Sequence, residues 1–185
     1  MKNSSKTGFK KTFITGLAIG TIIVSILLYG LISHYIDVFK TFYLINANIL
    51  GITIRKIQIG ENITEYEITI EIQVENPSNL PIFIESIYLD SISGVYLNNR
   101  RLYYVSYPRK GIYTEIPPLS SKEFSLTMRI YDESSPDLQY LKKALKSGIL
   151  NWVFPLRSLI RVSFKSGIVD LTCRYNGTYF LEDQS

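Results

Sequence analysis

The chain has 185 residues and 46% of them are hydrophobic, which suits one folded domain plus an appendage. Four of the 20 basic residues precede Asp37, whereas all 16 acidic residues lie from Asp37 on, so the net charge of +4 belongs to the N-terminal tail. A nucleic-acid-binding domain concentrates positive charge on one face, and we therefore expect no nucleic-acid partner. The single cysteine, Cys173, excludes a disulfide within the chain.

A transmembrane segment is the first element that the sequence predicts. No charged residue occurs between Lys11 and Asp37, and residues 13–32 read FITGLAIGTIIVSILLYGLI. Twenty helical residues rise about 30 Å, which is the thickness of the hydrocarbon core of a bilayer. A helix that is apolar on every side needs a large protein core or lipid around it, and the rest of this chain is too short to enclose it. We predict a transmembrane helix over residues 12–36.

The flanks of this segment predict its orientation. Four lysines lie in residues 1–11, and the positive-inside rule places such a tail in the cytoplasm. Aromatic residues gather over residues 29–43, where an aromatic belt would mark the other membrane surface. We therefore expect a single-pass signal anchor in the cell membrane, a stalk over residues 37–48 and an extracytoplasmic domain over residues 49–182.

Two alternatives to the anchor stay open. A cleaved secretory signal has an apolar region of only about 7–15 residues and a small-x-small cleavage site, whereas this run is longer and no such site follows it. A pilin-like leader also joins an apolar helix to a β-domain, but Lys10 and Lys11 separate Gly8 from the apolar run. Gly16 and Gly20 have the small-xxx-small spacing that pairs transmembrane helices, and they are candidates for a dimer contact.

Alternating polarity predicts β-strands after the anchor. Residues 65–75 read EYEITIEIQVE, which places apolar side chains on one face and polar ones on the other. Turn signals separate the strands: Asn98-Asn99 suits a tight hairpin, and Lys165-Ser166-Gly167 suits a three-residue loop. Short alternating strands with regular turn signals predict a β-sandwich. The other expected strands cover residues 52–59, 83–89, 94–97, 101–107, 122–131, 159–164 and 168–175.

One short helix interrupts the predicted strands. Ser135 is its expected cap, Pro136 fits its first position and Gly148 fits its end. Leucines recur on one face, as a helix packed on a core requires. Lysines 142, 143 and 146 crowd its last turns, where cations are favoured by the helix dipole. We interpret them as a solvated face rather than a docking patch. The leucines are Leu138, Leu141 and Leu145.

The sequence lacks the motifs of common catalytic and metal sites. It contains no Gly-rich phosphate loop, no Cys/His metal spacing and no nucleophile beside a matched base, so we expect no enzyme, no metal and no cofactor. Cys173 lies in an alternating apolar stretch and is predicted to be buried. His34 is expected to be an interfacial polar residue. Glu67, Glu71 and Glu75 share a strand face at a spacing that suits a cation, but outward carboxylates are usually solvated and deter edge aggregation.

One segment resembles a known family. The alternating strand of residues 66–75 runs into Asn76-Pro77-Ser78-Asn79 and then Leu80-Pro81-Ile82, which resembles the group 2 late-embryogenesis-abundant domain, also called the water-stress and hypersensitive-response domain. The closing hairpin from Phe154 on is similar as well. The resemblance implies an all-β, fibronectin-III-like sandwich of seven strands with one short helix and no enzymatic activity. We interpret the turn residues Asn76, Pro77, Asn79 and Pro81 as a structural corner.

These features predict location better than biochemistry. We expect a non-catalytic, membrane-anchored module of the cell envelope, with the lipid bilayer and either an envelope protein or a second copy of the chain as partners. Lipid or apolar-ligand handling and a pilin-like filament subunit are the alternatives. Asn62 and Asn176 begin N-glycosylation sequons in the expected outer domain. A composition rich in Ile, Tyr, Asn and Lys favours a prokaryote, and an archaeon among them.

Overall fold

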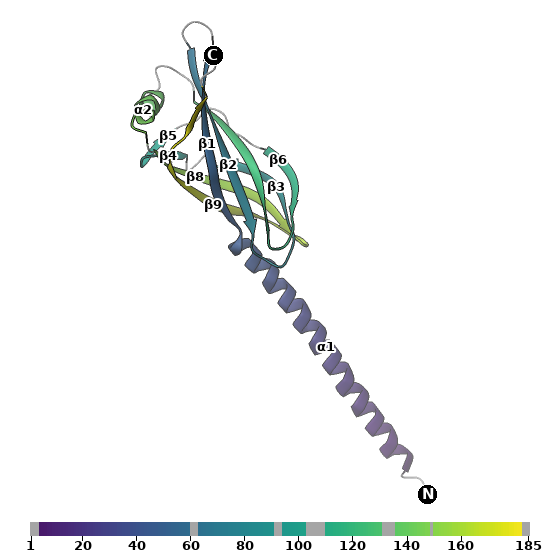
Figure 1. The fold of residues 1–185 in the computed structure, drawn as a ribbon. Coiled ribbons are helices and arrows are strands. Elements are labelled where there is room, and N and C mark those ends of the chain that lie inside the picture. The colour runs from purple at the N-terminus through teal and green to yellow at the C-terminus, as the bar shows by residue number, and fades with distance from the viewer. Residues whose placement is uncertain are drawn as a thin grey trace. The chain divides into compact units, whose positions relative to one another are not determined.

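The computed structural model describes residues 4–59, 63–90, 94–102, 110–130, 136–148 and 150–182. The chain divides into two compact units, Met1–Phe39 and Lys40–Ser185, and each is described by itself. The first unit is helical, and the second holds all the described strands (Figure 1).

The first unit belongs to one long helix, α1 (Ser4–Leu44). Its segment Phe13–Leu44 is long and apolar enough to span a membrane, and no side chain in its most apolar stretch is buried by protein. In water, leucine and isoleucine side chains would be exposed on every side of this helix, which is unfavourable. In a bilayer the same side chains would contact lipid tails, which carries no such penalty. Tyr35 and Phe39 meet edge to face, with their ring centroids 4.5 Å apart.

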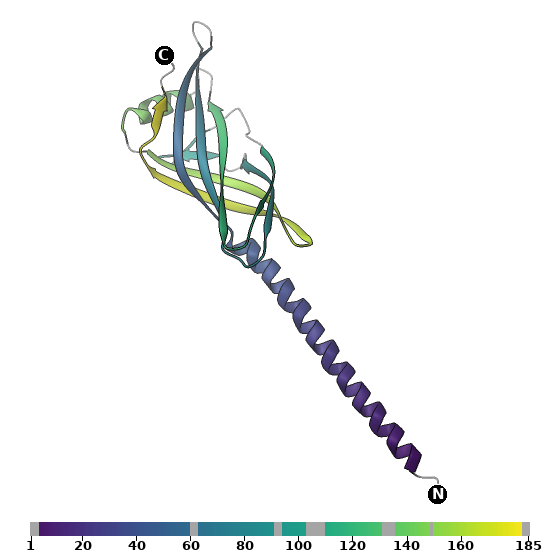
Figure 2. The same ribbon diagram turned by 45° about the vertical axis from the view of Figure 1, so that its right-hand side comes forward.

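The second unit is a β-sandwich. One sheet has the order β10-β1-β2-β7, and the other has the order β5-β4-β8-β3-β6 with β9 paired to β8. Figures 1 and 2 show the strands of the two sheets running in clearly different directions, as packed, twisted sheets do. The strands are β1 (Asn46–Ile59), β2 (Ile63–Asn76), β3 (Ile82–Leu89), β4 (Val95–Leu97), β5 (Arg100–Leu102), β6 (Lys110–Ile116), β7 (Ser120–Ile130), β8 (Leu150–Val162), β9 (Lys165–Gly177) and β10 (Phe180–Glu182).

The long strands account for the predicted fold class. Seven described strands have seven residues or more, and the other three have three residues each. Of the long strands, the first, second and fifth form one sheet, and the third, fourth, sixth and seventh form the other. This is the arrangement of a fibronectin type III domain. The predicted β-sandwich is therefore confirmed, with β4, β5 and β10 as short additions.

Alternation along the strands builds the core. In β2 the side chains of Ile68, Ile70, Ile72 and Val74 are buried, and those between them are partly or fully exposed, as predicted. The facing sheet contributes Trp152 and Phe154 among others, whose rings stack at 5.4 Å. Apolar side chains of both sheets thus fill the space between them, and this burial is the main favourable term in folding such a domain.

Several boundaries differ from the sequence prediction. Strand β8 begins at Leu150 rather than at residue 159, strand β6 was not predicted, and residues 103–107 of the strand predicted over 101–107 lie outside the described residues. Helix α1 ends at Leu44 and β1 begins at Asn46, so the folded domain starts before residue 49 and the predicted stalk of residues 37–48 is shorter. The last hairpin was predicted to turn at residues 165–167, but Lys165 already pairs with Val162. The turn is at Ser163-Phe164, with a positive φ of 52° at Ser163. Two-residue hairpins favour such a backbone, and Ser163 adopts it without glycine.

Helix α2 (Pro136–Leu145) forms where predicted, and Gly148 follows it with a φ of 91°. Leu138 and Leu141 are buried, whereas the expected third member of the face, Leu145, is only partly buried and Ala144 replaces it in the core. The predicted cap Ser135 lies outside the described residues.

Candidate functional site

Three loops meet at the end of the sandwich at which β1 begins, and we call this the near end. Asn46 pairs with Glu75, and Asn76 pairs with Ser120, so the β2–β3 and β6–β7 connections lie there. Ile82 pairs with both Ile116 and Val162, which brings the β8–β9 turn to the same end. The near end therefore comprises residues 76–81, 117–121 and 163–168, together with residues 40–46.

Asn76 holds the near end together. Its side chain is 1% exposed, and its Nδ2 donates to the carbonyl oxygens of Leu80 at 2.8 Å, Pro117 at 3.0 Å and Ile116 at 3.2 Å. Its Oδ1 accepts hydrogen bonds from the Ser78 hydroxyl at 2.7 Å and the Ser78 amide at 3.2 Å. Buried polar groups must be paired to be tolerated, and one amide here satisfies groups from two loops. This geometry matches the structural corner that we interpreted from the sequence.

The other corner residues have lesser parts. Pro77 follows Asn76 and ends the strand, because it has no N–H to donate to a ladder. Asn79, which was expected to bond the turn backbone, is exposed. Pro81 is partly exposed and comes directly before β3.

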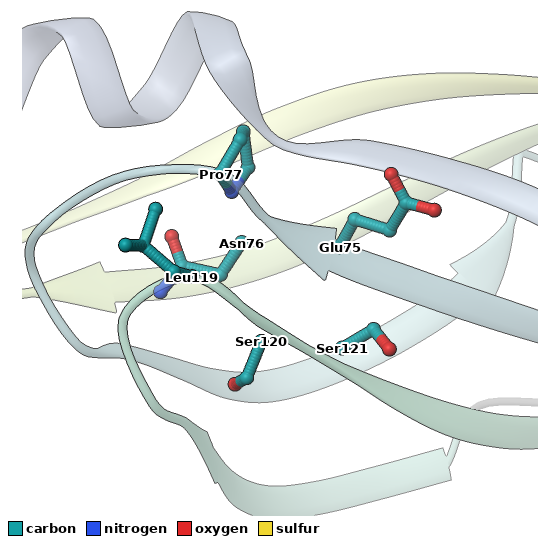
Figure 3. A pocket seen from close by; sticks show the side chains of 6 residues that line it. All are labelled: Glu75, Asn76, Pro77, Leu119, Ser120 and Ser121. Carbon is teal, nitrogen blue, oxygen red and sulfur yellow. The ribbon is translucent and has the colours of Figure 1, made fainter.

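A small open hollow of about 340 Å³ lies at this corner, lined by residues 75–77 and 119–121. Figure 3 shows its lining side chains, which include the carboxylate of Glu75 and the hydroxyls of Ser120 and Ser121. Some of these groups are already engaged: Glu75 accepts a hydrogen bond from Asn48 at 3.1 Å, and Ser120 donates one to Pro117 at 2.7 Å. The hollow lies outside the core, and the carboxylate of Glu75 and the hydroxyl of Ser120 bond within the domain.

Apolar side chains project from the near-end turns, and sequence reasoning did not single them out. Leu119 is 71% exposed, Phe164 is 68% exposed and Ile168 is 62% exposed. Leu119 and Phe164 occupy two-residue turns between alternating strands, and the break in alternation at these positions is the signal that could have found them. Tyr43, just before β1, is 85% exposed.

The glutamate row on β2 does not form a cation site. Glu67 lies 2.8 Å from Arg129, and Glu75 accepts from Asn48, so two of the three carboxylates have partners on neighbouring strands. Across the residues that the structure describes, no group of three potential metal ligands is found. Arg129 also lies 3.2 Å from the buried Glu65, so this row works as cross-strand pairing.

Cys173 is buried as predicted, with its sulfur 3.4 Å from the carbonyl oxygen of Ala47. Burial raises the pKa of its thiol to about 12, because the charged thiolate is disfavoured away from water. The thiol is therefore uncharged at neutral pH and is unsuited to nucleophilic chemistry.

The remaining predicted sites are dispersed. Asn176 is exposed on β9, whereas Asn62 lies outside the described residues. Gly16 and Gly20 lie in α1 with open space at both positions. Their pairing stays a prediction.

An aromatic–arginine cluster on the outer face of the second sheet was missed by the sequence reasoning. The guanidinium of Arg161 lies over the rings of Phe83 at 5.0 Å and Tyr113 at 5.4 Å, and it donates a hydrogen bond to the Tyr113 hydroxyl. These residues come from β8, β3 and β6. Only strand pairing brings them together, so no local pattern marks them.

Comparison with solved structures finds distant structural likenesses. No family model matches the chain, and no curated protein matches it. A protein from Archaeoglobus fulgidus is similar in structure, with 11% identity, 72% of this chain and 99% of that chain covered, and a TM-score of 0.38. A Northeast Structural Genomics Consortium target, SoR45, has 11% identity, 72% and 86% coverage and a TM-score of 0.44. A β-glucuronidase from glycoside hydrolase family 2 has 15% identity, 71% and 12% coverage and a TM-score of 0.36.

Proposed function

We propose that this chain is a membrane-tethered, non-catalytic module of the cell envelope, whose sandwich lies outside the membrane and serves in protein interaction or in structure. The observation that carries the proposal is the helix segment Phe13–Leu44, whose most apolar stretch is not buried by protein, joined to a β-sandwich. Soluble proteins do not leave such a helix in water. The four lysines before it favour a cytoplasmic N-terminus.

The late-embryogenesis-abundant resemblance is part of this proposal. It is supported by the sandwich, by the short helix between β7 and β8, and by the buried Asn76 at the corner that carries the family-like Asn-Pro pattern. Turn chemistry alone accounts for that corner, so the residues are assigned a structural part and no binding site is placed there.

An envelope protein or a second copy of the chain is the proposed partner. Self-association has a specific candidate surface, because Gly16 and Gly20 leave a smooth strip on α1 against which another helix can pack closely. Leucine at both positions should abolish a dimer measured by light scattering in detergent, whereas leucine at Gly30 should not. An unchanged dimer would remove this surface from the proposal.

The two alternative functions gain no support from the geometry. Lipid handling needs an apolar groove, whereas the described space between the sheets is filled by side chains, and the open hollow at the corner combines the apolar Pro77 and Leu119 with serine hydroxyls and a carboxylate. A filament subunit needs processing near Gly8, and intact N-terminal residues in the mature protein would exclude it.

Protease protection on intact cells tests the topology. Trypsin added outside should cut the domain after Asp37, and mass spectrometry should find residues 1–11 protected and uncleaved. A protected domain would invert the topology, and a missing N-terminus would replace the tether with a secreted or polymerised protein. A mass increase at Asn176 that glycosidase removes would support the outer location independently, because this asparagine is exposed.

A further inference from the structure

We propose that the near end of the sandwich rests on the bilayer that α1 spans, with the turn residues Leu119 and Phe164 inserted among the lipid headgroups. This inference rests on the proposed membrane tether and deepens it. It assigns a lipid-contact surface to the folded domain itself, in addition to the helix.

The distribution of exposed apolar side chains carries the inference. Among the described residues from Lys40 on, seven large apolar side chains are exposed, and five of them belong to the near end. Scattered exposed leucines are ordinary on protein surfaces, but confinement of most of them to one end of a sandwich marks a contact surface. The five are Tyr43, Leu44, Leu119, Phe164 and Ile168.

The backbone holds the two turn residues outward. Leu119 has a φ of 53°, which a leucine rarely adopts, and its N–H donates to the Ser78 carbonyl at 3.1 Å. Ser163 has a φ of 52° and directs the following Phe164 away from the hairpin. Figure 2 shows this β8–β9 hairpin extending past its neighbours. Positive φ at leucine is costly, so the fold maintains an exposed leucine there at the expense of backbone strain.

The short segment between the uncharged run of α1 and the sandwich makes lipid the expected partner of the near end. The uncharged run that follows Lys11 ends at residue 36, and α1 continues to Leu44. Eight helical residues rise about 12 Å, which is close to the depth of one headgroup layer plus a short side chain. Asn46 begins β1 two residues later, so the chain holds the near end close to the membrane surface whatever the tilt of the helix.

The chemistry of the near end suits a headgroup region rather than a charged protein. Exposed Ser121 and Ser163 flank the apolar tips, and the charged residues of the near end are Lys40 and Lys165. Aromatic and aliphatic tips among hydroxyls fit the interface between hydrocarbon and water. On a zwitterionic phosphatidylcholine surface, which carries no net charge, insertion of the apolar tips rather than attraction of the two lysines supplies the contact, and added salt should leave it unchanged.

Depth-dependent fluorescence quenching tests the contact in the full-length chain. A Cys173→Ala background carries one new cysteine, Leu119→Cys or Phe164→Cys, labelled with an environment-sensitive dye and reconstituted into phosphatidylcholine vesicles. Lys143→Cys on α2 is the matched control at the opposite end of the sandwich, where the side chain is exposed, and Ile22→Cys reports the span. Lipids that bear a spin label near the headgroup are the quencher for positions 119, 164 and 143, and lipids labelled near the end of the acyl chain are the quencher for position 22, which lies at the middle of the predicted span.

We expect positions 119 and 164 to be quenched about threefold more than position 143, equally in low and high salt. If positions 119 and 164 match position 143 while position 22 is quenched, the tether stands and the lipid contact of the domain is overturned. If position 22 is also unquenched, the span is wrong, and the proposed function fails together with this inference.

Discussion

The two ends of the sandwich are held together by different kinds of interaction. At the near end a single buried amide, that of Asn76, bonds the carbonyls of two loops. At the opposite end, which we call the far end, α2 covers the strands with Leu138 and Leu141, and Asp137 lies 3.3 Å from Arg100. Figure 1 shows α2 beside β4 and β5.

This difference indicates which environment, membrane surface or water, suits each end. The far end buries its apolar residues and presents lysines, as a surface in water should. At the near end, Asn76 pairs the backbone carbonyls of two loops within the domain, and the turns expose the side chains of Leu119 and Phe164. The near end, with a buried polar side chain and exposed apolar turns, suits a membrane surface. The far end, with buried leucines and exposed lysines, suits water.

The largest effect is expected from Asn76→Asp. The introduced carboxylate cannot donate, and it would place a negative charge against three carbonyl oxygens, so unfolding should become easier by about 3–5 kcal/mol. The single tryptophan, Trp152, is buried and reports unfolding by denaturant through its fluorescence. Asn79→Asp is the control, because Asn79 is exposed and should change stability by less than about 0.5 kcal/mol. Equal losses in both variants would refute the central part given to Asn76.

Leu141→Ala tests the far end and should cost about 3 kcal/mol, because a fully buried leucine leaves a cavity when it is truncated. The same denaturation experiment measures it. Lys143→Ala on the exposed side of α2 should be nearly neutral. A loss below about 1 kcal/mol would mean that α2 contributes little to the core, and the comparison of the two ends would collapse.

Gly167→Ala should cost about 1–2 kcal/mol at the near end, because an added Cβ would lie 2.8 Å from Cε1 of Phe42. Phe42→Leu removes the rigid ring, so the cost of the alanine should shrink in the double variant. Stability in detergent measures both. Additive losses would show that Phe42 and Gly167 do not touch.

The smallest signal is expected at Cys173, which lies in the core between the two ends. Its thiol should resist maleimide at neutral pH in the folded chain and react on unfolding, because its pKa is raised to about 12 by burial. A folded-state pKa above the ordinary thiol pKa of 9.0 favours the protonated folded state, so this stabilisation is present below pH 9.0 and is lost as the pH rises towards about 12. Rapid labelling of the native chain would contradict the burial, and Phe164→Cys supplies the exposed comparison.

Local patterns were sufficient where one segment decides its own structure. The alternation of residues 65–75, the Asn98-Asn99 turn with φ of 47° and 65°, and the helix α2 all follow from side-chain period and backbone preference. The turn predicted at residues 165–167 was wrong and lies at Ser163-Phe164, because pairing between β8 and β9 extends to Val162 and Lys165 and overrides the glycine signal.

The sequence by itself determined that this chain has an apolar helix and a β-sandwich, because hydrophobic period and length act within one segment. Only the tertiary structure decided that Asn76 joins two loops, that Arg161 lies over Phe83 and Tyr113, and that exposed apolar residues collect at one end. Each of these depends on strand order and register, which bring together residues far apart along the chain, such as Phe83 and Arg161, which are 78 positions apart. Such contacts have no local signature, because the same side chains in another register would face solvent or a different neighbour.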